Sequence, residues 1–164
     1  MIPRKFPPRA AVLAAAAALA LALAACGKGP TKGENGADPV FPDDYLETFT
    51  EVRDCRFSSS HPGMVRVLVN DAGADAYLAG ENPLPTGTIV VKEVFDGTDC
   101  DDYSELGTWA AMRKEAAGFD PEDGDWHWQE VRPDRSVETD TKTSCIACHS
   151  RDECAGRDFM CTEE

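Results

Sequence analysis

Alternating apolar and polar residues predict strands in the middle of the chain. Residues 64–70 carry three valines on one face and mainly polar groups on the other. Residues 88–95 are rich in β-branched side chains and give the strongest strand pattern. Residues 109–114 and 126–132 also favour strands. The pattern therefore predicts a domain built mainly on a β-sheet.

Helical spacing is confined to short segments. Residues 41–52 have apolar side chains three and four positions apart, and residues 71–79 form a second predicted helix that Asn70 would cap. A last helical segment is expected over 142–151. Loops are expected at 55–63, 83–87, 96–104 and 118–125. Because strands and helices do not alternate strictly, we predict an α+β fold with a mainly antiparallel sheet.

The N-terminal residues predict export. Residues 1–25 combine a short basic region with an apolar run, as secretory signals do. The run ends in Leu-Ala-Ala before Cys26, which resembles a bacterial lipoprotein processing site and implies cleavage there with acylation of Cys26. An ordinary signal peptide with an incidental cysteine is the alternative. Residues 26–40 would then form a flexible tether and residues 41–164 a single domain, held at the bacterial cell envelope, on its periplasmic or outer-membrane face, by the lipid anchor only.

Charge narrows the range of partners. The formal net charge is −14, which repels phosphate backbones and excludes nucleic acid as an expected partner. An acidic surface would attract a basic redox partner protein, although simple solvation explains the same composition.

Candidate chemistry gathers near the C-terminus. Cys145 and Cys148 are three positions apart and His149 follows directly, which is the pattern for covalent attachment of one haem c. Each thiol would add across one porphyrin vinyl group, and His149 would become an axial ligand of the iron. A redox dithiol lacks the expected βαβ context. A zinc site would need a second pair of ligands, and Cys154 and Cys161 are widely spaced for that role.

These features together resemble the cytochrome P-460 family, which includes the cytochromes c-prime-beta. The resembling pieces lie at 61–70, 85–93 and 124–128, followed by the late haem motif and Asp158-Phe159. The resemblance implies a mainly antiparallel β fold with one c-type haem held by the C-terminal segment, usually in a homodimer. It also implies a small nitrogen-oxide ligand, because members oxidise hydroxylamine or bind nitric oxide.

The resemblance also assigns roles to single residues. Cys145 and Cys148 match the thioether cysteines, and His149 matches the proximal ligand. Lys92 matches a lysine that enzymatic members link covalently to the porphyrin, while a solvent-facing lysine is the alternative.

The sequence differs from the family pattern at the distal carboxylate. Enzymatic members place it in the stretch matching 108–111, where Trp109 stands here, and Glu105 is the nearby acid. Lys92 and Glu105 are thus the catalytic candidates, and an apolar distal face would favour gas binding over oxidation. An electron carrier without substrate chemistry is the alternative function.

Further histidines and arginines offer secondary roles. His61 and His127 are candidate sixth ligands of the iron, although the resemblance implies an open position. Arg66, Arg113 and Arg151 are candidate partners for haem propionates, and exposed ion pairs are the alternative.

Four cysteines remain outside these motifs. An even number in an exported protein predicts two disulfides among Cys55, Cys100, Cys154 and Cys161. Three connectivities are possible, and we favour Cys55–Cys100 with Cys154–Cys161 because the second pair closes a short loop near the haem motif.

Overall fold

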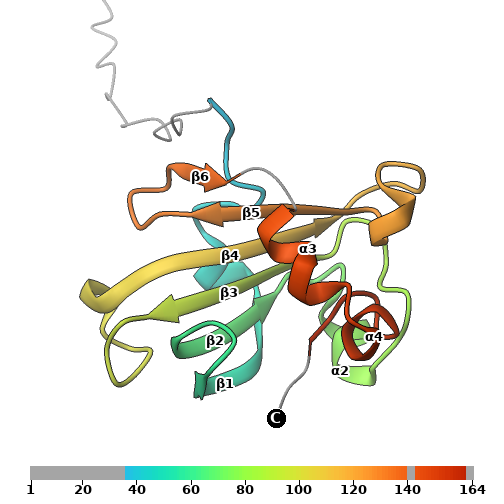
Figure 1. Ribbon diagram of the computed structural model, residues 1–164. Coiled ribbons are helices and arrows are strands. Elements are labelled where there is room, and N and C mark those ends of the chain that lie inside the picture. Colours follow the sequence, from blue (N-terminus) through green and yellow to red (C-terminus); the bar gives the residue numbers. More distant parts are fainter. Residues whose placement is uncertain (1–35, 140–142, 162–164) are drawn as a thin grey trace, which may run out of the picture.

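The computed structural model describes residues 36–139 and 143–161. The predicted signal peptide, Cys26 and most of the tether lie outside these residues. Six strands follow one another as an antiparallel meander, each paired with its neighbour in the chain (Figure 1). They are β1 (Thr50–Ser58), β2 (Gly63–Val69), β3 (Ile89–Phe95), β4 (Leu106–Lys114), β5 (Trp126–Val131) and β6 (Val137–Thr139). The expected antiparallel α+β fold is confirmed.

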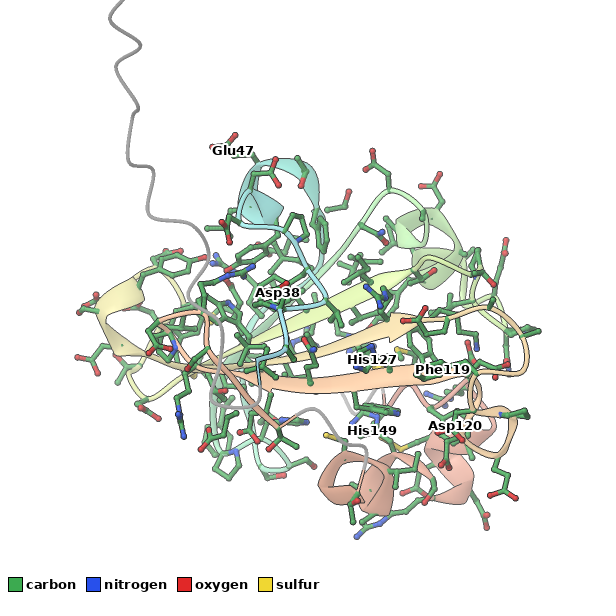
Figure 2. All side chains as sticks on the ribbon, turned by 90° about the horizontal axis from the view of Figure 1, so that it is seen from above. Asp38, Glu47, Phe119, Asp120, His127 and His149 are labelled. Carbon is green, nitrogen blue, oxygen red and sulfur yellow. A yellow bond between two sulfur atoms is a disulfide. The ribbon has the colours of Figure 1, made fainter. Side chains whose placement is uncertain are left out.

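Short helices cover the sheet on both sides. They are α1 (Tyr45–Thr48), α2 (Ala74–Ala79), α3 (Thr143–His149) and α4 (Asp152–Ala155), with 3-10 turns η1 (Tyr103–Glu105) and η2 (Pro121–Asp123). Figure 2 shows α1, marked by Glu47, on one side of the sheet and the C-terminal helices on the other. In the described part of the chain no helix is long and apolar enough to cross a bilayer.

The N-terminal part of the domain differs from the prediction. The helix expected over 41–52 is only the single turn α1, and β1 occupies Thr50–Ser58, where a loop was expected from residue 55. This strand lies at the edge of the sheet, and its pairing with β2 shifts register twice. Its side chains are therefore largely exposed or half-buried and lack the apolar alternation that marks inner strands.

Asn70 does not cap a helix. Its side-chain amide donates to the Gly87 carbonyl at 2.9 Å, and its oxygen accepts from the Ile89 amide at 2.8 Å. The side chain thereby ties the end of β2 to the start of β3, and α2 begins only at Ala74. β4 in turn begins at Leu106, three residues earlier than expected.

Two apolar clusters lie against the two faces of the sheet. One packs Phe41 and Tyr45 of the N-terminal segment against Val91 and Trp109. The other includes Val67, Val90, Met112 and Trp128, with Cys145 and Phe159 of the C-terminal segment packed against it. Because side chains alternate along a strand, adjacent residues of β3 and β4 belong to different faces.

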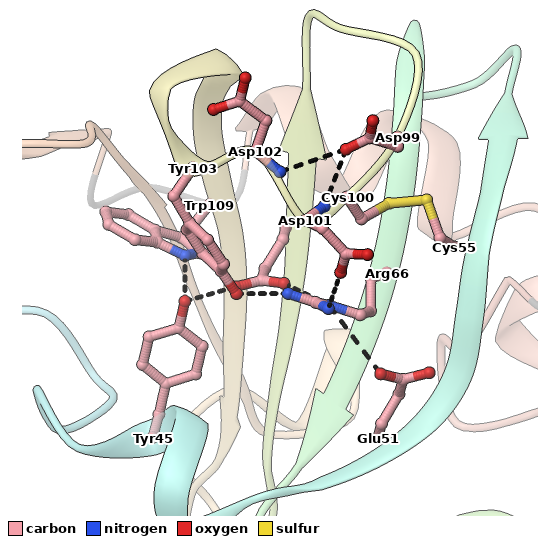
Figure 3. A network of polar contacts seen from close by, with 11 residues as sticks. Tyr45, Glu51, Cys55, Arg66, Asp99, Cys100, Asp101, Asp102, Tyr103 and Trp109 are labelled. Atoms are coloured by element: carbon pink, nitrogen blue, oxygen red, sulfur yellow. Dashed lines mark hydrogen bonds and ion pairs between the residues drawn. A yellow bond between two sulfur atoms is a disulfide. The ribbon is translucent and has the colours of Figure 1, made fainter.

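A buried polar network stabilises the face covered by α1 (Figure 3). Glu93 is fully buried and pairs with Arg66 Nε at 2.7 Å. The Tyr45 and Tyr103 hydroxyls donate to Glu93 Oε1 at 2.5 and 2.9 Å, and Trp109 Nε1 donates to Tyr45 at 2.9 Å. Burial, reinforced by Glu93, raises the pKa of both tyrosines, that of Tyr103 to about 12.

Candidate functional site

The C-terminal motif lies on one helix and faces a cavity. Helix α3 ends at His149, and Cys145 and Cys148 lie about one helical turn apart on it. All three residues line a cavity of about 620 Å³ between this helix and the sheet. The structure thus brings the three predicted haem residues together at one cavity.

His149 is oriented by the chain that follows it. Its Nδ1 lies 2.6 Å from the Phe159 carbonyl oxygen, so Nδ1 carries the proton and donates, which leaves the Nε2 lone pair available for a metal. Its ring lies at 4.8 Å from the Trp128 ring in an edge-on contact. Burial lowers the pKa of His149; the hydrogen bond to Phe159 opposes this shift and the charge of Lys92 adds to it, so the net effect favours the neutral imidazole. Figure 2 shows His149 between the sheet and the C-terminal helices.

A row of paired residues forms the sheet wall of the cavity. Val67 pairs with Lys92, Lys92 with Ala110, and Ala110 with Glu130. All four line the cavity, so Lys92 faces the same space as His149 rather than bulk solvent. Ala110 between the two charged residues is small and leaves room above the sheet for a ligand. The structure therefore places Lys92, but not a carboxylate of β4, at the cavity.

The two residues considered for the distal position lie elsewhere. Trp109 packs in the cluster on the opposite face, because it precedes Ala110 by one residue and side chains alternate. Glu105 is exposed at the end of η1 and is not among the residues that line the cavity. Glu130 of β5 is a half-buried carboxylate that does line it. The alternation of Trp126, Trp128 and Glu130 along β5 was the sequence signal for this placement.

Of the other histidines, only His61 contributes to the cavity. Its ring centroid lies 6.4 Å from that of His149. Burial, with smaller contributions from the charge of Lys92 and from His149, lowers the pKa of His61 to about 4. His127 faces the other side of the sheet, where Nδ1 lies 3.5 Å from Glu115, and Figure 2 shows it opposite His149.

The arginines at the cavity are mostly not the expected ones. Arg151 lines it, but Arg66 belongs to the Glu93 network and Arg113 pairs with Glu115 at 2.6 Å. Arg53 and Arg56 of β1 line the cavity and were missed, since β1 was expected to be a helix and a loop.

The described residues form two disulfides, Cys55–Cys100 and Cys154–Cys161, which is the pairing favoured from the sequence. With Cys154 and Cys161 joined, neither thiol is available to complete a zinc site with the haem motif.

The comparison with known families decides the class of the protein. The family model described as Cytochrome P460 matches residues 42–162. The chain belongs to the cytochrome P460 family. It is therefore a c-type haem protein. A comparison with curated proteins finds none that matches the chain.

The cavity of this cytochrome P460 protein fits a haem in three respects. Its volume is in the range of cofactor pockets. His149 presents a neutral imidazole whose Nδ1 is already engaged. Trp128, which lines the cavity, has a buried indole Nε1 with no hydrogen-bond partner among the described residues, and a buried donor of this kind calls for an acceptor. A haem propionate oxygen or an iron-bound small molecule would supply one.

Proposed function

We propose that this protein is an exported, lipid-anchored monohaem cytochrome that binds or oxidises small nitrogen oxides, such as nitric oxide or hydroxylamine. When bound, the haem supplies an iron with an open coordination position for the small molecule. The observation that carries the proposal is the shared cavity of Cys145, Cys148 and His149 with Lys92 of the sheet. Cys145 and Cys148 would hold one haem covalently, and His149 Nε2 would bind its iron.

The residues of the sheet wall would act on the bound molecule and on the ring. Lys92 lines the cavity, and the family resemblance implies a covalent link between this side chain and the porphyrin edge. Glu130 would accept protons released from hydroxylamine, because it lines the same cavity and a general base must lie within hydrogen-bond reach of the proton that it takes. This assignment replaces Glu105, which lies outside the cavity. The electrons would leave to a redox partner protein.

A second candidate function rests on His61. Its imidazole lies in the cavity with its ring 6.4 Å from that of His149, and no hydrogen bond engages it among the described residues. Two imidazoles that face one cavity could both hold an iron, because a neutral imidazole is a common metal ligand. If His61 occupied the sixth position, the protein would be an electron-transfer cytochrome without substrate chemistry.

The setting of the protein is part of the same proposal. Cleavage before Cys26 and acylation of its thiol would tether the domain to a membrane surface of the bacterial envelope, facing the periplasm or the outside. Pairing of two domains into a homodimer is expected from the family resemblance. A basic partner would suit the net charge of −14.

Optical spectra of the purified mature protein test these functions. Intact mass should first show one covalent haem, and its absence would end the proposal. A high-spin spectrum that changes on addition of nitric oxide is expected. A low-spin spectrum that ignores nitric oxide and becomes high-spin in His61→Ala would establish the electron-transfer alternative. Lys92→Ala should shift the ferrous band towards that of an ordinary c-type haem, and an unchanged band would remove Lys92 from the ring.

A further inference from the structure

The segment that accepts the hydrogen bond of His149 adopts an unusual backbone. Asp158 and Phe159 both have positive φ angles, 54° and 66°, in the left-handed region that side chains other than glycine rarely occupy. This backbone conformation brings Cβ close to the following carbonyl oxygen, which disfavours it for residues with a side chain. Two in succession persist only where surrounding contacts hold them. The Phe159 carbonyl is therefore placed at His149 by neighbouring interactions and not by its own backbone preference.

Asp158 fastens this segment to the sheet. Its buried carboxylate pairs with Lys114 Nζ at 2.5 Å and accepts from the Leu84 amide at 2.8 Å. Its backbone oxygen accepts from Trp126 Nε1 at 3.0 Å. The Lys114 and Asp158 side chains are 9% and 5% exposed, so water competes little with this pair. Three groups, Lys114 Nζ, the Leu84 amide and Trp126 Nε1, thus fix the peptide that precedes the Phe159 carbonyl.

Phe159 itself packs into space that a glycine leaves. A Cβ added at Gly124 would lie 2.6 Å from Phe159 Cε2, closer than side chains approach. The ring therefore rests directly on the backbone before β5. This contact restricts movement of Phe159, and with it of the Phe159 carbonyl, relative to the sheet.

The Cys154–Cys161 disulfide closes the segment. The two cysteines are seven residues apart, on either side of Asp158 and Phe159, and both line the same cavity as His149. The bridge joins α4, which packs on α3, to the end of the strained segment. The bridge therefore limits how far the Phe159 carbonyl can move away from the His149 imidazole.

We propose that the Cys154–Cys161 disulfide and the Lys114–Asp158 pair are positioning groups that set the donor strength of His149 towards the haem iron. This inference rests on the proposed ligation by His149. A donated Nδ1–H raises the basicity of the ligating nitrogen, which favours the ferric state. Loosening the 154–161 segment weakens that hydrogen bond, so the midpoint potential rises and the bond between iron and histidine weakens.

The test compares two variants of the haem-loaded mature protein, each of which lacks one of the two disulfides. Cys154→Ser/Cys161→Ser should raise the midpoint potential in a spectroelectrochemical titration and lower the iron–histidine stretching frequency in resonance Raman spectra. Cys55→Ser/Cys100→Ser, which removes the bridge whose Cys100 belongs to the cluster on the far face, should change neither. Equal shifts in both variants, or no shift in either, would overturn the proposal.

Asp158→Asn provides an independent test that keeps the disulfide. It removes the charge paired with Lys114 and should raise the midpoint potential, as the double cysteine substitution does. An unchanged potential and stretching frequency would refute the positioning role, and this test remains valid if the double cysteine variant fails to fold. The outcome is separable from the proposed function. If the wild-type protein carries no covalent haem, the proposed ligation by His149 is wrong. If wild type and variants all carry haem and have the same midpoint potential, only the positioning role is wrong.

Discussion

Replacing Arg66 with methionine should destabilise the protein by about 3 kcal/mol, because it leaves the Glu93 carboxylate buried without its cation. Glu93 is fully buried, whereas the Arg66 side chain is 14% exposed and its Nε lies 2.7 Å from the carboxylate. Methionine keeps the volume of the aliphatic stem, so the change isolates the guanidinium group. The two tyrosines that donate to Glu93 remain.

The magnitude follows from what replaces the lost cation. Removing one partner of a buried ion pair costs about 3–5 kcal/mol when the other charge stays unpaired. The hydroxyls of Tyr45 and Tyr103 still donate to the carboxylate, and charge-assisted hydrogen bonds contribute about 1.5–3 kcal/mol each. The loss should therefore fall at the lower end of the range.

Urea unfolding of the haem-loaded mature protein measures this loss. Arg66→Met/Glu93→Gln removes the buried charge as well and should recover most of the stability. Arg113→Met is the matched control, because Arg113 is 38% exposed in its pair with Glu115 and should lose at most about 1 kcal/mol. Equal losses for Arg66→Met and Arg113→Met would refute the reasoning. The optical spectrum of Arg66→Met should stay unchanged, because the network lies on the face away from the cavity.

Three further predictions concern other parts of the domain. Glu130→Gln should slow hydroxylamine oxidation by about a hundredfold or more in steady-state assays, whereas exposed Glu105→Gln should not; equal rates would contradict the proton-acceptor role. Gly124→Ala should lower the free energy of unfolding by at least about 1 kcal/mol in urea titrations, through its φ of 69° and the clash with Phe159; unchanged stability would contradict it. The folded pKa of Tyr103 is about 12, above its usual 10.0, so the unfolded chain loses this proton first and stability falls as pH rises from 10 to 12. Tyr103→Phe should flatten that fall in alkaline unfolding curves, and an equally steep fall would refute it.

The inner strands were predictable because burial of one or both of their faces requires apolar residues, which appear in the sequence as alternation or as a β-branched run. The ranges expected for β2, β3 and β5 differ from the observed bounds by one residue at each end or less. The edge strand β1 was missed because half of its backbone and most of its side chains meet solvent, so no apolar alternation was required. Arg53 and Arg56 of the cavity were missed with it.

The position of Trp109 shows a different limit. Around it β4 reads Thr-Trp-Ala-Ala-Met, which offers apolar residues to both faces and therefore does not reveal which face meets the cavity. A shift of one residue exchanges the two faces, so the expected wall residue Trp109 became a core residue and Ala110 became the wall. Because Ala110 pairs with Glu130, the carboxylate of Glu130 lies on the cavity face, and no sequence motif had indicated this residue.

The adjacent residues Lys92 and Glu93 show how the sheet separates function from stability. Lys92 faces the cavity with His149, while Glu93 faces the buried network with Arg66 and Tyr45. Because β3 is held by β2 and β4 along its whole length, neither side chain can reach the other face without a change of register. The anchored Glu93 therefore keeps Lys92 directed at the cavity. Changes on the cavity face should alter spectra and potential at little cost in stability, and changes on the network face should do the reverse.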